Sequence, residues 1–242
     1  MNKESLHFPG QFLMAGRFLS DFITSFPSPA NLKDIATGRY LLGNQATLEL
    51  CGLKTMEQFI GLTINELDCL IESRWGNTYA HIIDDLDTQV RLRQQVVVEK
   101  NQILLTHSGF VRIQNIIKIP VFNENNKTTA IFTYSYDLTK TLDLSSIFAF
   151  YKQAYSDPRI AIQYFLHYLG IDSYFLETLT ETELAVLIAM KYNSAHKSVA
   201  RKLGIQPKTV EIHTGHLRSK LKDGCLYKLL SLLRHDLTPS IE

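Results

Sequence analysis

The stretch LTETELAVLIAMKYNSAHKSVARKLGIQPKTVEIHTGHLRSKL, residues 179–221, decides how the C-terminal part of this chain folds. Its apolar residues recur at the three- and four-residue spacing of amphipathic helices. The pattern is interrupted twice, so it predicts three successive helices, over residues 180–191, 194–203 and 207–222. A fourth helix is expected over residues 225–235.

Capping residues support these helix boundaries. Thr180 with Glu183 three residues later is a capping box at the start of the first helix. Asn193 stands where we expect that helix to end in a left-handed residue. Gly204 allows a sharp turn after the second helix, and Pro207 begins the third at a position where its missing N–H costs nothing.

The third helix is expected to have an apolar side and a polar, basic side. Val210, Leu217 and Leu221 share the apolar side, and Thr214 lies close to it. A helix that follows a glycine turn and presents such a polar face fits the major groove of duplex DNA. Basic side chains bind phosphates there, and others reach base edges. The expected DNA-contacting residues are Lys197, Lys208, Thr209, Glu211, Ile212, Gly215, His216, Arg218 and Lys220.

The same window resembles the LuxR/NarL-type helix-turn-helix family, without a gap from Leu179 to Leu221. The matching positions are Leu179-Thr180, Glu183, Val186-Leu187, Lys197, Ala200, Leu203-Gly204-Ile205, Thr209-Val210, His213, Leu217 and Lys220-Leu221. The resemblance implies a DNA-binding transcription regulator whose fourth helix supports a dimer contact. For His213 it implies a packing role.

Five positions depart from the family pattern: Thr182, Asn193, Gln206, Glu211 and Gly215. Gln206 replaces the usual capping Ser or Thr, which weakens that cap. Glu211 and Gly215 lie on the expected base-reading face, so the preferred DNA sequence should be unusual. There Glu211 can accept from a cytosine amino group, and the neighbouring Ile212 can pack on a thymine methyl.

Charge is segregated along the chain although the whole carries a formal net charge of only +1. Residues 179–235 hold ten Lys/Arg against four Asp/Glu, and the remainder holds fifteen against twenty. A basic end of this kind indicates a polyanionic partner, which we expect to be double-stranded DNA.

Several classes of protein are not indicated. No apolar run approaches the roughly 20 residues of a membrane span, and residues 1–10 have no signal-peptide pattern. Cys51, Cys69 and Cys225 form no metal-spaced cluster. We therefore expect a cytoplasmic protein without membrane association, disulfide or structural metal. No catalytic or phosphate-binding motif stands out, so we expect no enzyme activity.

The N-terminal half predicts a mixed α+β domain. A helix over 11–21 is followed by short strands at 31–34 and 39–43 and by a helix over 45–51, capped by Asn44 and ended by Gly52. Another helix should run from Thr55 to Gly61, and a short one should begin near Thr63. A longer helix over 75–94 and strands over 96–106, 110–122 and 128–136 complete the order.

This order is that of a PAS domain, and residues 26–53 resemble the opening of such domains. The resembling residues are Pro27, Lys33-Asp34, Gly38-Arg39-Tyr40, Asn44-Gln45-Ala46 and Gly52. The resemblance covers about residues 15–140. It implies a five-stranded antiparallel sheet with flanking helices that binds a small molecule or dimerises.

The ligand of such a domain is not indicated by a motif. Trp75, Tyr79 and Tyr134 are candidates to line an apolar pocket. The flavin-binding motif of some PAS domains is absent, and His81 is a weak candidate for haem. Trp75, Tyr79 and either Asp84 or Asp87 faintly resemble the acyl-homoserine-lactone site of quorum-sensing regulators, although the spacing to the Asp fits poorly.

We therefore predict three segments: a PAS-like sensory or dimerisation domain with an N-terminal helix over residues 1–140, a helical linker over 141–176, and a LuxR-type helix-turn-helix domain over 177–242. The predicted function is transcription regulation by a homodimer. Two alternatives remain: a lactone-type quorum-sensing regulator, and a protein-interaction module that does not bind DNA. Binding of both half-sites of an operator requires a correctly spaced dimer.

Overall fold

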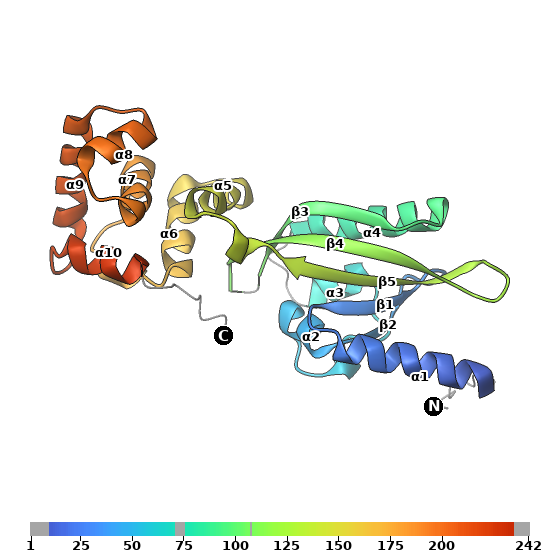
Figure 1. Ribbon diagram of the computed structural model, residues 1–242. Coiled ribbons are helices and arrows are strands. Elements are labelled where there is room, and N and C mark those ends of the chain that lie inside the picture. Colours follow the sequence, from blue (N-terminus) through green and yellow to red (C-terminus); the bar gives the residue numbers. More distant parts are fainter. Residues whose placement is uncertain (1–9, 71–75, 107, 235–242) are drawn as a thin grey trace. The chain divides into compact units, whose positions relative to one another are not determined.

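A computed structural model describes residues 10–70, 76–106 and 108–234 of the chain. It divides into two compact units (Figure 1), one comprising residues up to 108 together with 112–138, the other residues 109–111 and those from 139 onward. Trp75 lies outside the described residues. Within the described ranges, no helix has both the length and the apolar character needed to cross a bilayer.

The first unit is built on a five-stranded sheet with strand order β2-β1-β5-β4-β3. Strand β1 pairs antiparallel with both β2 and β5, and β5 pairs antiparallel with β4. The strand bounds are β1 Ala30–Asp34, β2 Tyr40–Gly43, β3 Val97–Leu105, β4 Val111–Phe122 and β5 Thr128–Asp137. This sheet with its flanking helices confirms the predicted α+β, PAS-like fold class.

Helices cover both faces of this sheet. Their bounds are α1 Gly10–Ser25, α2 Gln45–Cys51, α3 Ile64–Leu70 and α4 Gly76–Arg93. Helix α1 contacts β1 and β2, whereas α4 contacts β3 and β5 (Figure 1). Because side chains alternate along a strand, β5 presents Phe132 and Tyr134 to one face and Thr133 and Ser135 to the other. The α1 face holds the aromatic group of Phe22, Phe26, Phe132 and Tyr134.

Asn44 ties α2 to the sheet. Its buried side chain accepts hydrogen bonds from the backbone N–H groups of Thr47 and Ala30 and donates to two carbonyl groups, those of Phe26 and Ser28. One Asn side chain therefore caps the helix and also orders the chain that enters β1. Gly52 ends α2, as predicted, and takes the left-handed conformation.

The helix predicted from Thr55 to Gly61 is wrong in extent. Only the short 3-10 helix η1, Met56–Gln58, forms there. Gly61 has a φ of 84° and turns the chain. Its N–H donates to the Tyr40 carbonyl, and the Tyr40 N–H donates to the Leu62 carbonyl. Pairing with the first residue of β2 therefore competes with continuation of the helix.

The second unit is helical. Its α-helices are α5 Leu144–Ala154, α6 Pro158–Tyr168, α7 Glu181–Tyr192, α8 His196–Leu203, α9 Pro207–Lys220 and α10 Leu226–Arg234. Two 3-10 helices, η2 Thr139–Thr141 and η3 Asp172–Tyr174, accompany them. Asp143 caps α5 and Asp157 caps α6, with Pro158 in the first turn. Both α5 and α6 contact α7.

Two predicted helix ends differ in this unit. Asn193 is extended, at φ −154° and ψ 118°, and not left-handed. Its side chain accepts the Ala195 N–H, which turns the chain toward α8 without a left-handed residue. Helix α9 ends at Lys220, two residues early, because Leu221 forms a β-bridge with Phe175.

Candidate nucleic-acid interface

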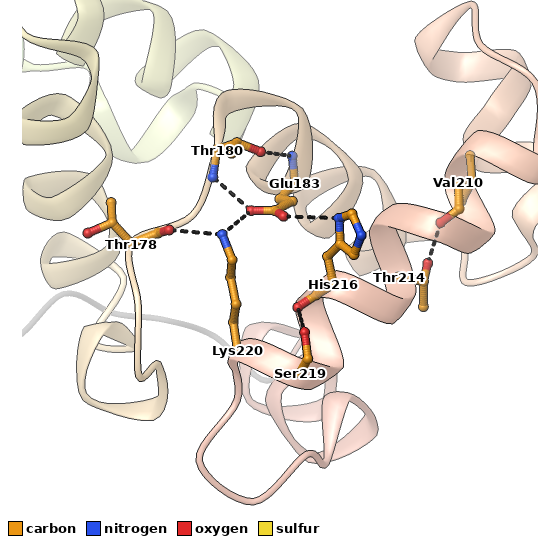
Figure 2. A network of polar contacts seen from close by, with 8 residues as sticks. All are labelled: Thr178, Thr180, Glu183, Val210, Thr214, His216, Ser219 and Lys220. Atoms are coloured by element: carbon orange, nitrogen blue, oxygen red, sulfur yellow. Dashed lines mark hydrogen bonds and ion pairs between the residues drawn. The ribbon is translucent and has the colours of Figure 1, made fainter.

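Helix α9 is held by a buried apolar stripe. Val210, Thr214 and Leu217 are at most 1% exposed, and α9 contacts both α7 and α8. The Thr214 hydroxyl donates to the Val210 carbonyl at 2.7 Å, so its polar atom is satisfied inside the core (Figure 2). The stripe fixes which side of α9 faces outward.

The turn before α9 follows the prediction. Gly204 has φ 66°, and Pro207 is in the first turn of α9. Gln206 is the N-cap residue, and its side chain makes no capping hydrogen bond. Pro207 has no N–H, and the Thr209 and Val210 N–H groups donate to the Gln206 carbonyl. The Lys208 N–H is therefore the group at this helix start that can donate to a phosphate oxygen.

Most of the predicted DNA-contacting side chains are accessible to solvent. Lys197, Lys208, Glu211, Ile212, His216 and Arg218 are exposed, as is the backbone of Gly215, and Thr209 is half-buried. A Cβ at Gly215 would meet no atom within 4 Å, so packing does not require glycine there. Lys208 pairs with Glu211 at 3.0 Å, which partly neutralises one cation of the surface.

Lys220 differs from the other cations because it is engaged inside the domain. Its Nζ lies 2.8 Å from Glu183 Oε2 and donates to the Thr178 carbonyl at 3.1 Å (Figure 2). Glu183 also accepts the Thr180 N–H, which completes the predicted capping box. Burial alone would raise the pKa of Glu183, but the hydrogen bonds from Lys220 and Thr180 outweigh it and lower the pKa.

The first unit contains a cavity of about 50 Å³ between its helices and the sheet. Its lining is mostly apolar, with a few polar side chains. By volume, the cavity has room for a few water molecules or for a small ligand. The lining residues include Asn31, Tyr40, Thr47, Cys51, Phe59, Tyr79, Ile116, Lys118, Thr133 and Ser135.

A buried ionic group lies at this cavity. Asp87 contacts Lys33 at 2.6 Å and Lys118 at 2.5 Å, and both lysine side chains are at most 3% exposed. Burial lowers the pKa of Lys118 from 10.5 to about 8, although Asp87 counteracts this. Two lysines therefore share one carboxylate, which leaves a formal excess of one positive charge in the interior.

The sequence-predicted ligand residues are separated by the structure. Tyr79 lines the cavity, and Gln114 donates to its hydroxyl at 3.3 Å. Tyr134 lies on the other face of β5, against Phe26 and Phe132, and does not line this cavity. His81 is exposed.

Sequence reasoning missed Lys33, Asp87 and Lys118 as a group. Lys33 follows Leu32 in β1, and Lys118 stands between Ile117 and Ile119 in β4; a lysine beside apolar residues in a strand is a weak sign of buried charge. Asp87 lies one residue after Leu86, itself buried, on α4. The lactone-type alternative predicted that Asp84 or Asp87 contacts a ligand. In the structure Asp87 pairs with Lys33 and Lys118, and Asp84 accepts a hydrogen bond from the Asn65 side chain, so both carboxylates have protein partners.

Comparison with known proteins identifies the C-terminal helices. Residues 177–226 match the family described as bacterial regulatory proteins, luxR family, and form its helix-turn-helix domain, as predicted. No curated protein matches the chain in sequence.

Three solved structures are similar to the chain. The PAS domain from Bordetella pertussis BvgS is 23% identical, with 55% of this chain and 98% of that one covered at a TM-score of 0.45. Vibrio cholera VqmA in a ligand–DNA complex is 22% identical; the match covers 98% of this chain and 93% of that one, at a TM-score of 0.45. A phage VqmA–DPO complex is 21% identical; the match covers 93% of this chain and 91% of that one, at a TM-score of 0.45.

Proposed function

We propose, from the premise that residues 177–226 are a luxR-family domain, that this chain regulates transcription by binding double-stranded DNA through α9. The observation that carries the proposal is the outer surface of α9 and α8. It exposes Lys197, Lys208 and Arg218 beside an uncapped helix start, and it carries side chains long enough to reach base edges.

Genomic footprinting tests this proposal. Lys208 and Arg218 are changed together to Gln, and the footprints of the wild-type chain are expected to disappear because two phosphate contacts are lost. A matched control changes Lys140 and Arg159, both exposed and away from α9, to Gln. Footprints that survive in the Lys208/Arg218 variant favour the alternative, a protein-interaction module that does not bind DNA.

We further propose that the PAS-like unit senses a small molecule in the cavity beside Lys118. A ligand with a hydrogen-bond acceptor or a negative charge suits this site, because the interior carries one lysine more than its carboxylate neutralises. Tyr40 and Tyr79 offer aromatic surface in the same lining. The small volume favours a ligand of only a few non-hydrogen atoms.

Mass spectrometry of small molecules extracted from the purified protein tests the sensing role. A species present with the wild-type chain and lost with Lys118→Met supports it. Identical extracts from both proteins contradict it. The visible spectrum of the same preparations reveals any bound haem or flavin.

We propose that the DNA-binding form is a homodimer, because one helix-turn-helix unit contacts a single half-site. Apolar side chains available for such a contact are Phe18 on α1, 74% exposed, and Tyr227 on α10, 77% exposed. Light scattering on the full chain measures the oligomeric state, and a monomer in the presence of bound DNA contradicts the proposal. A ligand that changes the spacing of the two reading helices would then control operator binding.

A further inference from the structure

Three potential metal ligands meet where α7 and α9 pack together. Glu183 of α7 and His213 and His216 of α9 each offer one ligand atom, and these atoms all lie within 4.8 Å of one another. The two histidines are three residues apart, so they project from neighbouring positions of one helix face. Two imidazoles with one carboxylate form a donor set that binds zinc and related first-row ions.

The distances suit a shared ion better than a direct contact. His216 Nδ1 lies 3.6 Å from Glu183 Oε1, which is too long for a good hydrogen bond (Figure 2). Two ligands bound to one tetrahedral zinc at 2.0–2.1 Å are about 3.4 Å apart. Because the His216 side chain is 57% exposed, it is free to adjust by the remaining difference.

His213 provides a second observation. Its Nδ1 atom is buried and has no hydrogen-bond partner among the residues that the structure describes. Buried polar atoms are nearly always paired, and a bound ion is one recognised explanation of an exception. The His213 and His216 rings are nearly perpendicular, at 87°, with centroids 6.0 Å apart.

Glu183 is already oriented for such a role. Its Oε2 atom is held by Lys220 at 2.8 Å and by the Thr180 N–H at 2.8 Å. These bonds fix the carboxylate in the way that outer-shell partners fix metal ligands, and they leave Oε1 directed at His216. The charge of Lys220 opposes a cation nearby and therefore limits the affinity.

We propose that Glu183, His213 and His216 bind one first-row transition ion of the zinc class. The ion fastens the recognition helix α9 to α7 and leaves a coordination position for water. It also holds His216 toward α7, so an occupied site withdraws this side chain from the DNA-reading surface. The sequence spacing of the ligands does not reveal the site, because Glu183 lies 30 residues from His213 and only the packing of two helices joins them.

Zinc titration of the chelator-treated full chain, in competition with a zinc-binding dye, tests the proposal. The wild-type chain is expected to bind one equivalent, and His216→Ala to bind at least about tenfold more weakly, since even outer-shell changes cost this much. His81→Ala is the matched control, because His81 is exposed on α4, outside the cluster. Circular dichroism verifies that each variant is folded.

Cobalt provides a direct reading of the coordination. Added Co²⁺ is expected to give visible d–d absorption with the wild-type chain and with His81→Ala, and to give none with His216→Ala. A wild-type chain that binds no zinc overturns the proposal, as does equal binding by wild type and His216→Ala. Neither measurement depends on DNA binding, so failure here leaves the proposed regulatory function standing.

Discussion

Replacing Glu183 by Gln is expected to loosen the packing of α9 on α7. The Glu183 side chain is 4% exposed and accepts from Lys220 and from the Thr180 N–H. Gln keeps an acceptor for Thr180 but removes the charge that Lys220 requires. A hydrogen bond to a charged group contributes about 1.5–3 kcal/mol. We expect a loss of about 2 kcal/mol, because Lys220 is 18% exposed and water partly replaces the carboxylate.

The effect of this substitution depends on pH with a definite sign. The folded-state pKa of Glu183 is lowered from 4.5, so its stabilisation is fully present above 4.5. It is lost as the pH falls through the folded-state pKa, because protonation removes the charge in the wild-type chain as well. The difference between wild type and Glu183→Gln should therefore be constant from pH 7 down to about 5 and narrow below 4.5.

Native-state hydrogen exchange of the chelator-treated full chain measures this difference at the amides of α7 and α9 without a contribution from the proposed metal ion. Glu181→Gln is the matched control, since Glu181 is on the same helix and pairs with Lys152 at 3.0 Å. Both side chains of this ion pair are nearly half exposed, so we expect a change of no more than about 1 kcal/mol. Equal effects of the two substitutions, or a Glu183→Gln effect that persists undiminished at low pH, would refute the reasoning.

Three further predictions concern the remainder of the chain. Asn44→Ala removes a buried side chain with several backbone partners and should destabilise the first unit by about 2–4 kcal/mol in chemical denaturation, whereas a change below about 1 kcal/mol contradicts its role. Gly109→Ala introduces a Cβ that overlaps a ring carbon of Tyr164, at a backbone φ of +83°. Calorimetry should detect a loss of about 1–3 kcal/mol, and an unchanged transition counts against the packing of this turn. The stability of the wild-type chain relative to Lys118→Met should increase as the pH rises from about 8 to 10.5, because Lys118 releases its proton in the folded chain but keeps it in the unfolded chain. Urea titrations measure this difference in stability, and a difference that does not change with pH contradicts the buried charge.

Local signals predicted much of the secondary structure. Asn44 and Gly52 bound α2 where the sequence predicts its ends, and Thr180 with Glu183 forms the expected capping box. Gly204 makes the expected turn after α8, in the left-handed conformation. These residues act on their own neighbours in the chain, so the sequence alone carries the information.

Features that depend on distant partners were not predictable in this way. Asn193 can end α7 either in the left-handed conformation or by accepting the Ala195 N–H with its side chain, and the structure shows the second arrangement. The early end of α9 depends on a bridge between Leu221 and Phe175, which are 46 positions apart. A hydrophobic pattern does not reveal such long-range pairing.

The candidate sites likewise contain features that a local pattern predicts and features that depend on distant partners. The exposed face of α9 follows from helical periodicity, and Lys208 and Arg218 lie on it as predicted from the pattern. Lys220 belongs to the same helix, yet its charge is used by Glu183, 37 residues earlier in the chain. The shared pairing of Lys118 with Asp87 likewise requires the packing of α4 on the sheet.

The affinity of the full chain for duplex DNA as a function of salt concentration tests the central claim most directly. We predict that the logarithm of the binding constant falls linearly with the logarithm of salt concentration. Replacing Lys208 and Arg218 by Gln should reduce the magnitude of the slope by about 2, one for each lost phosphate contact. Salt-insensitive binding, or a slope that is the same in the double variant, would contradict DNA recognition by α9.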